Sequence, residues 1–67
     1  MFSSYQNAIL YLVDYYERIY PDDTSGERAE EVCSIKGAAY MIHKIYAVGI
    51  NRVFNDMRKT MKVLAEE

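Results

Sequence analysis

The C-terminal half of the chain carries one apolar stripe that keeps a single helical phase from Val32 to Leu64. Apolar residues recur there every three or four positions, as one face of an α-helix requires. The stripe consists of Val32, Ile35, Ala39, Ile42, Tyr46, Ile50, Val53, Met57, Met61 and Leu64. The N-terminal helical pattern is about half as long, so it cannot cover the whole stripe. The C-terminal part must therefore either fold back at a turn or pack against another chain.

The length of the chain limits how it can be stabilised. It has 67 residues, which suit a single helical domain over 1–67, and chains this short rarely gain more than about 3–5 kcal/mol from one core. Cys33 is the only cysteine and His43 the only histidine, which argues against an intrachain disulfide and a Cys- or His-rich metal site. We therefore expect no cofactor or metal, and stability from helix packing and self-association.

The first helix is predicted over about 4–20. Ser3 or Ser4 can cap it, Gln6 can complete a capping box with Ser3, and Pro21 ends it. Most of its apolar residues share one face, but Leu10 and Tyr11 lie on or near the polar face, with Tyr15 at the border. Because tyrosine is favoured in interfaces, we assign Leu10, Tyr11 and Tyr15 to a partner-binding surface.

A loop over 21–25 precedes a second helical pattern over about 26–65, and Thr24 with Glu27 forms a capping box at its start. Between Ala38 and Val48 this pattern is apolar nearly all round, because Met41, Ile45 and Val48 lie opposite the main stripe. A helix that is apolar on every side is expected to be enclosed on every side.

Two arrangements fit this pattern, and both are all-α. In the preferred one, 26–65 is a single long helix, and the chain is a helical hairpin that dimerises into a helical bundle. In the alternative, Gly49 is a left-handed C-cap, Asn51 caps a further helix, and the chain is a monomeric three-helix bundle with a break near 49–51. Dimerisation would use eight apolar residues of the stripe region: Ile42, Tyr46, Ile50, Val53, Phe54, Met57, Met61 and Leu64.

Charge is distributed unevenly along the chain. Residues 1–31 carry seven acids and two bases, net −5, and residues 32–67 carry six bases and three acids, net +3. This asymmetry favours antiparallel packing of the halves or an antiparallel dimer. No secretion signal or membrane-spanning segment is recognised, so we expect a cytoplasmic protein with no membrane partner.

Motifs for enzymatic chemistry are not found. In the acidic segment 22–26, a calcium-loop register with Gly26 sixth puts Pro21 and Val32 where carboxylates belong. Cys33 and His43 would lie about 15 Å apart along one helix, too far for a nucleophile and its base. We therefore predict that the chain is not an enzyme.

The segment Val48-Gly49-Ile50-Asn51-Arg52 resembles the turn of the helix-turn-helix family of DNA-binding proteins. Ile45 and Asn55 depart from that family's pattern, which places a small residue four positions before the glycine and an aliphatic one six after it. The resemblance implies a dimeric DNA-binding regulator. Its nucleic-acid contacts would come from Arg52, Asn55, Arg58, Lys59 and Lys62.

The favoured functional prediction is a small, non-enzymatic protein–protein interaction module. It would act as a regulator, adaptor or inhibitor by docking a helical, tyrosine-rich surface on a protein partner, as small accessory proteins of phages and mobile elements do. The dimeric DNA-binding regulator is one alternative. A purely structural, self-associating subunit is the other.

Overall fold

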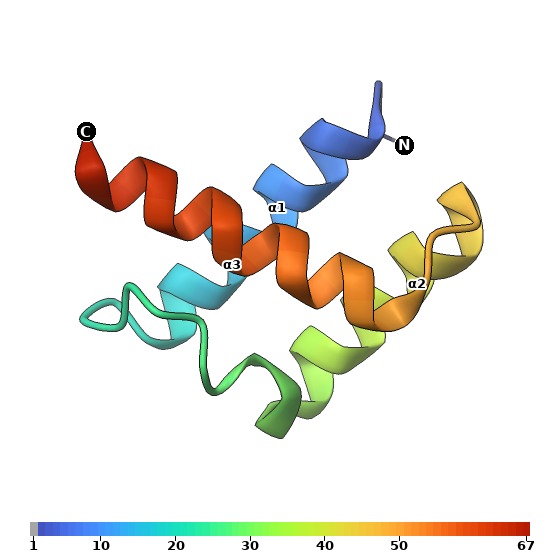
Figure 1. Cartoon of the computed structure of the whole chain (residues 1–67). Helices are drawn as coiled ribbons and strands as arrows, with labels where there is room; N and C mark the ends of the chain where they lie inside the picture. Colours follow the sequence, from blue (N-terminus) through green and yellow to red (C-terminus); the bar gives the residue numbers. More distant parts are fainter. Residues whose placement is uncertain (1) are drawn as a thin grey trace.

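The described part of the chain is built from three α-helices. The computed structural model describes residues 2–67, in which α1 (Tyr5–Ile19), α2 (Cys33–Tyr46) and α3 (Ile50–Glu66) follow one another, with a 3₁₀ turn, η1 (Ala29–Glu31), before α2. α1 and α2 contact each other, and α3 lies across both of them (Figure 1). Residues 2–67 contain no strand. The predicted all-α fold class is confirmed.

The N-terminal helix begins and ends within one residue of its predicted limits. Ser4 is the N-cap, and its hydroxyl accepts a hydrogen bond from the Asn7 backbone N–H at 3.1 Å. The partner of this cap is therefore the backbone of Asn7 rather than a capping box with Gln6. Tyr20 ends the helix next to Pro21, which has no N–H with which to continue it.

The single long helix over 26–65 of the preferred arrangement is wrong, and the three helices of the alternative are confirmed, with the break at 47–49. α2 ends at Tyr46, and Ala47 adopts the left-handed conformation with φ 53°. The Val48 N–H then donates to the His43 carbonyl at 3.2 Å, the longer bond of a Schellman motif. Gly49 is extended, with φ −55° and ψ 142°, and serves as the N-cap of α3. The left-handed residue is thus Ala47 instead of Gly49, and Asn51 lies inside α3.

The reversal at 47–49 brings the two halves of the apolar stripe together in one chain. The core consists of Ala8, Ile9, Leu12, Val13, Tyr16, Ala29, Ile35, Ala39, Ile42, Val53, Phe54, Met57 and Met61. α1 covers the stripe of α2 and that of α3, so the second half of the stripe needs no partner chain.

The residues predicted for self-association mostly belong to this core. Ile42, Val53, Phe54, Met57 and Met61 are buried within the single chain. Tyr46 and Ile50 are partly buried against the same core, and Leu64 is exposed near the end of α3. The assignment of the five buried residues to a dimer interface is therefore corrected, because it assumed that α2 and α3 were one continuous helix; that of Tyr46, Ile50 and Leu64 stays a prediction.

The start of the second helix also differs from the prediction. Gly26 has φ 74°, and a Cβ at this position would lie 3.0 Å from Arg58 Cγ and 3.1 Å from Met57 Cε. Glycine is required because the backbone is both left-handed and closely packed against α3. The chain passes through η1 before α2 begins at Cys33, and Thr24 and Glu27 form no capping box there.

Within residues 2–67, none of the helices combines the length and the apolar composition needed to cross a bilayer.

The reversal at Ala47 makes a prediction with a definite sign. Replacing Ala47 with Gly is expected to raise the free energy of unfolding by about 0.5–1 kcal/mol, because glycine adopts positive φ without the steric penalty of a Cβ. Urea denaturation followed by circular dichroism measures the change. Gly49→Ala, at a position with negative φ and open surroundings, is the matched control and should change stability by less than about 0.5 kcal/mol. A destabilised Ala47→Gly would mean that the helix continues through this position.

Candidate interaction surface

The three residues assigned to partner binding all lie on α1. Leu10 and Tyr11 are exposed, and Tyr15 is partly buried against the core. The rings of Tyr11 and Tyr15 are 6.1 Å apart, and the Phe2 ring is 5.3 Å from that of Tyr11. Leu10 is separated from Tyr11 by the step of about 100° between consecutive helical residues. Tyr11 and Tyr15 are therefore part of an aromatic cluster, and Leu10 lies outside it.

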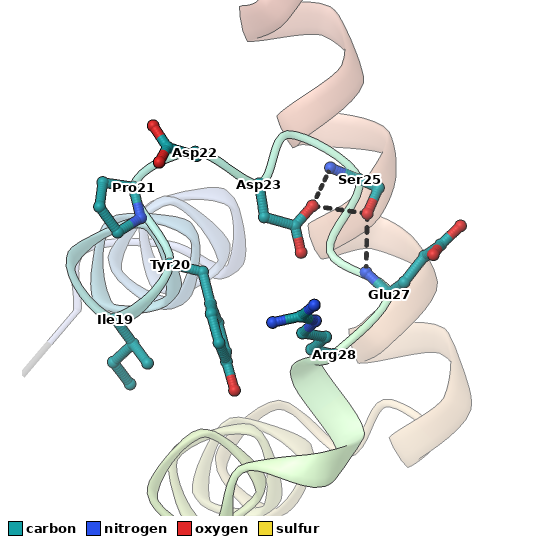
Figure 2. A pocket seen from close by; sticks show the side chains of 8 residues that line it. All are labelled: Ile19, Tyr20, Pro21, Asp22, Asp23, Ser25, Glu27 and Arg28. Carbon is teal, nitrogen blue, oxygen red and sulfur yellow. Dashed lines mark hydrogen bonds between the residues drawn. The ribbon is translucent and has the colours of Figure 1, made fainter.

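Helical spacing and Figure 2 define which side of α1 carries these tyrosines. Tyr11, Tyr15 and Ile19 follow one another at intervals of four residues and so share one side of the helix. In Figure 2, Ile19 lies on the side of α1 away from α3, and Tyr20 lies between Ile19 and α3. The Tyr11–Tyr15–Ile19 stripe therefore borders α2 and faces away from α3.

A second apolar stripe lies on the neighbouring side of α2. Ala38, Met41 and Ile45 are spaced at three and four residues; Ala38 is partly buried, and the other two are 40% and 43% exposed. α2 runs antiparallel to α1, because the rings of Tyr5, at the start of α1, and Tyr46, at the end of α2, are 5.6 Å apart. The Ala38–Met41–Ile45 stripe comes before the core residues of α2 in helical phase, as the Tyr11–Tyr15–Ile19 stripe does on α1. Because the two helices are antiparallel, both stripes lie on the same side of the helix pair, which is the side away from α3.

The two stripes together form a surface that we name the outer face. It comprises Tyr11, Tyr15 and Ile19 on α1 and Ala38, Met41 and Ile45 on α2. Met41 and Ile45 were not among the predicted site residues. The signal that could have identified them is the all-round apolar character of 38–48. One side of this segment is buried in the core, and the opposite side remains exposed.

Arg58, one of the predicted nucleic-acid contacts, is used inside the molecule. Its Nε donates to the Gly26 carbonyl at 3.1 Å, and its Nη2 lies 2.6 Å from Glu30 Oε1. The guanidinium also lies 5.8 Å from the centre of the Phe54 ring. Arg58 therefore joins the loop and η1 to α3, and its guanidinium is already paired with a carboxylate.

The other predicted nucleic-acid contacts form one exposed stripe on α3. Arg52, Asn55, Lys59 and Lys62 are exposed and follow at intervals of three or four residues. Arg52 lies 3.7 Å from Asp56, which also accepts a 2.6 Å hydrogen bond from the Tyr5 hydroxyl. Burial, and then this bond, raise the pKa of Tyr5. This basic stripe lies on α3, whereas the outer face lies on the side of α1 and α2 away from α3.

The loop between α1 and η1 is held by a polar network around Asp23. Its carboxylate accepts bonds from the Ser25 N–H at 2.7 Å and the Ser25 hydroxyl at 2.6 Å, and also from the Tyr16 hydroxyl. The Tyr16 oxygen in turn accepts the Arg28 N–H at 3.2 Å. The bonds from Ser25 and then Tyr16 lower the pKa of Asp23 to about 2, and burial, then the Asp23 bond, raises that of Tyr16 to about 12.

A hollow of about 460 Å³ opens beside this loop (Figure 2). Tyr20 and Arg28 line it, with the guanidinium 5.2 Å from the ring centre. Asp23 and Ser25 on its rim are bonded to each other. The side chains of Asp23 and Ser25 in this hollow therefore hold the loop.

Cys33 and His43 are not brought together. Cys33 is exposed at the start of α2, while His43 near its end has Nδ1 at 2.5 Å from the Val48 carbonyl oxygen. Since a carbonyl oxygen only accepts, Nδ1 carries a proton. No three His, Cys, Asp or Glu side chains within residues 2–67 are grouped to hold a metal ion.

No family model matches the chain, and no match is found among curated proteins or solved structures.

The Asp23 network predicts how stability depends on pH. The lowered pKa of Asp23 means that its contribution is present above its usual value of 3.8 and is lost as pH falls through about 2. The raised pKa of Tyr16 means that its contribution is present below 10 and is lost as pH rises through about 12. Unfolding free energies measured across both ranges should show a reduced acid slope in Asp23→Asn and a reduced alkaline slope in Tyr16→Phe. The exposed neighbour Asp22, replaced by Asn, is the control; equal slopes in all proteins would contradict the network.

Proposed function

We propose that this chain is a small protein–protein interaction module that docks through the outer face. The supporting observation is that Tyr11, Met41 and Ile45 are 45%, 40% and 43% exposed on adjoining sides of two packed helices. Burying apolar area of this kind is favourable by roughly 25 cal/mol per Å². Covering the outer face with another protein would therefore contribute favourably to the free energy of association.

The composition of the outer face suits a specific contact. Tyrosine and methionine are enriched in the cores of interfaces, and charged residues are depleted there. Tyr11 and Tyr15 present ring faces and hydroxyl tips, and Met41 is a flexible apolar side chain that adapts to its neighbour. Arg18 and Asp14, paired at 2.9 Å, line a small hollow together with Tyr11 and Tyr15 on α1. This is an apolar centre with a polar rim.

The partner surface is expected to be helical. An amphipathic helix that lies along a pair of packed helices places anchors at i, i+3, i+4 and i+7. A chain with this surface acts by occupying a site on its partner. A regulator, adaptor or inhibitor is the role that we propose for it.

Site-specific photo-cross-linking tests this proposal. A photoreactive phenylalanine analogue placed at Tyr11 should cross-link a defined protein that is identified by mass spectrometry, and the same analogue at Lys59 on α3 should not. The identified protein is then purified and titrated against the chain and against its Met41→Ser variant by calorimetry. Affinity is expected to fall at least about tenfold in Met41→Ser. Equal cross-linking from both positions, or unchanged affinity, would contradict docking through the outer face.

The basic stripe of α3 supports a second candidate, nucleic-acid binding. Arg52, Lys59 and Lys62 could neutralise phosphates, with Asn55 between them. If so, fluorescence anisotropy with duplex DNA should show strong salt dependence, and replacing Lys59 and Lys62 with Gln should reduce the log–log slope by about 2. Lys36→Gln on α2 is the control. Absence of binding at low salt would eliminate this candidate.

A further inference from the structure

We propose that the chain has a second, domain-swapped state, in which 47–49 becomes helical and α3 leaves its own chain. α2 and α3 then form one helix, and α3 packs on α1 and α2 of a second copy. The closed bundle described above is the state of the single chain, and the swapped state is a dimer of two open chains. Three features of the molecule support this state: the helical phase of the core residues, the conformation of the hinge, and the packing site of α3.

The buried residues of α2 and α3 would share one face if the two helices were continuous. At 100° per residue they fall within an arc of about 100°. These residues are Ile35, Ala39, Ile42, Val53, Met57 and Met61. The closed bundle does not require this agreement, because the turn lets each helix take its own orientation. A swapped dimer does require it, because one straight helix must present its first half to the core of one copy and its second half to that of the other.

The hinge at 47–49 is short, and Ala47 strains it in the closed form. Within residues 2–67, Ala47 is the one residue other than glycine with positive φ, at 53°. A Cβ is strained in this conformation, and a helical φ of about −63° removes the strain. His43 holds the reversal, because its carbonyl accepts the Val48 N–H at 3.2 Å and its Nδ1–H donates to the Val48 carbonyl. A short hinge under strain is the geometry that favours domain swapping.

The packing site on α1 and α2 fits α3 of a second copy, because it already holds α3 in the closed chain. α3 contacts both other helices. Val53, Phe54 and Met57 of α3 are buried, and Arg58 donates to the Gly26 carbonyl. A second copy supplies the same side chains to the same site, so swapping re-forms these contacts between chains. The two states therefore differ mainly at the hinge and in the entropy of association.

Swapping leaves the outer face of each copy exposed, because α3 packs on the opposite side of α1 and α2 (Figure 2). The closed chain carries one outer face, and the dimer carries two. A partner with two binding sites would be held by the dimer with higher avidity than by the single chain. The hinge would therefore control the number of docking surfaces per particle.

Refolding at low and high protein concentration tests the swap. Because α3 must leave a buried site, exchange requires unfolding in urea before refolding, and size-exclusion chromatography with light scattering then measures the dimer fraction. Gly49→Ala is expected to lower the dissociation constant at least about tenfold. Alanine is favoured over glycine in the continuous helix, and in the closed form no atom beyond the neighbouring residues lies within 4 Å of this Cβ position. Ala47→Gly is expected to raise it at least about tenfold, because glycine relieves the left-handed strain and weakens the continuous helix.

Gly37→Ala is the matched control. Position 37 lies inside α2, has open space at its Cβ position and is helical in both states, so the dissociation constant should not change. The unaltered chain gives a second measurement, in which labelled and unlabelled chains are mixed before refolding. The contact between the Met57 methyl group and the Gly26 α-protons should then arise between chains in the dimer and within one chain in the monomer.

Three results would overturn the swap. A monomer at every concentration, for the unaltered chain and for Gly49→Ala, would exclude it. Shifts that are not of opposite sign in Gly49→Ala and Ala47→Gly would place any dimer on another surface, and so would a dimer whose Met57–Gly26 contact lies within each chain. The swap does not depend on docking through the outer face, so cross-linking from Tyr11 tests the proposed function separately.

Discussion

The reversal between α2 and α3 is the constraint on which the rest of the structure depends. Because Ala47 is left-handed and the Val48 N–H closes on His43, the apolar stripe of 32–64 is divided into two segments that share one core. The same amino acids in one continuous helix would leave half of the stripe uncovered. Turning the chain at 47–49 therefore changes what is left for a partner to cover: apart from Leu64 the stripe packs within the chain, and the opposite side of α2 remains exposed.

Arg58 makes the second contact that holds this arrangement. Its bonds to the Gly26 carbonyl and to Glu30 fasten the loop and η1 to α3, while Gly26 allows α3 to approach the loop backbone closely. The Tyr16–Asp23 network holds the other side of the same loop. These contacts position α2 against α1, and the outer face exists because the two helices lie side by side.

Much of the fold was predictable from local chemistry. Ser4 and Pro21 define the limits of α1, and the periodicity of apolar residues predicts all-α structure. The reversal was not predictable in the same way, because the stripe keeps its phase across 47–49 and because an alanine occupies the left-handed position where glycine is usual. The late start of α2 depends on contacts between residues about thirty positions apart, such as Gly26 with Arg58. The exposed side of Met41 and Ile45 was visible as an excess of apolar residues, but its location required the placement of α1 and α3.

The most direct test of the account is an intramolecular distance. In this fold the Met57 methyl group and the sulfur that carries the Met61 methyl group lie close to Gly26, each 3.1 Å from the position that a Cβ would take there, whereas in one continuous helix Gly26 and Met61 would be about 52 Å apart. Nuclear Overhauser contacts from these methyl groups to the Gly26 α-protons should appear in a sample of labelled chain, and isotope mixing should show that they arise within one chain. Their absence, or their appearance only between chains, would contradict the folded-back bundle.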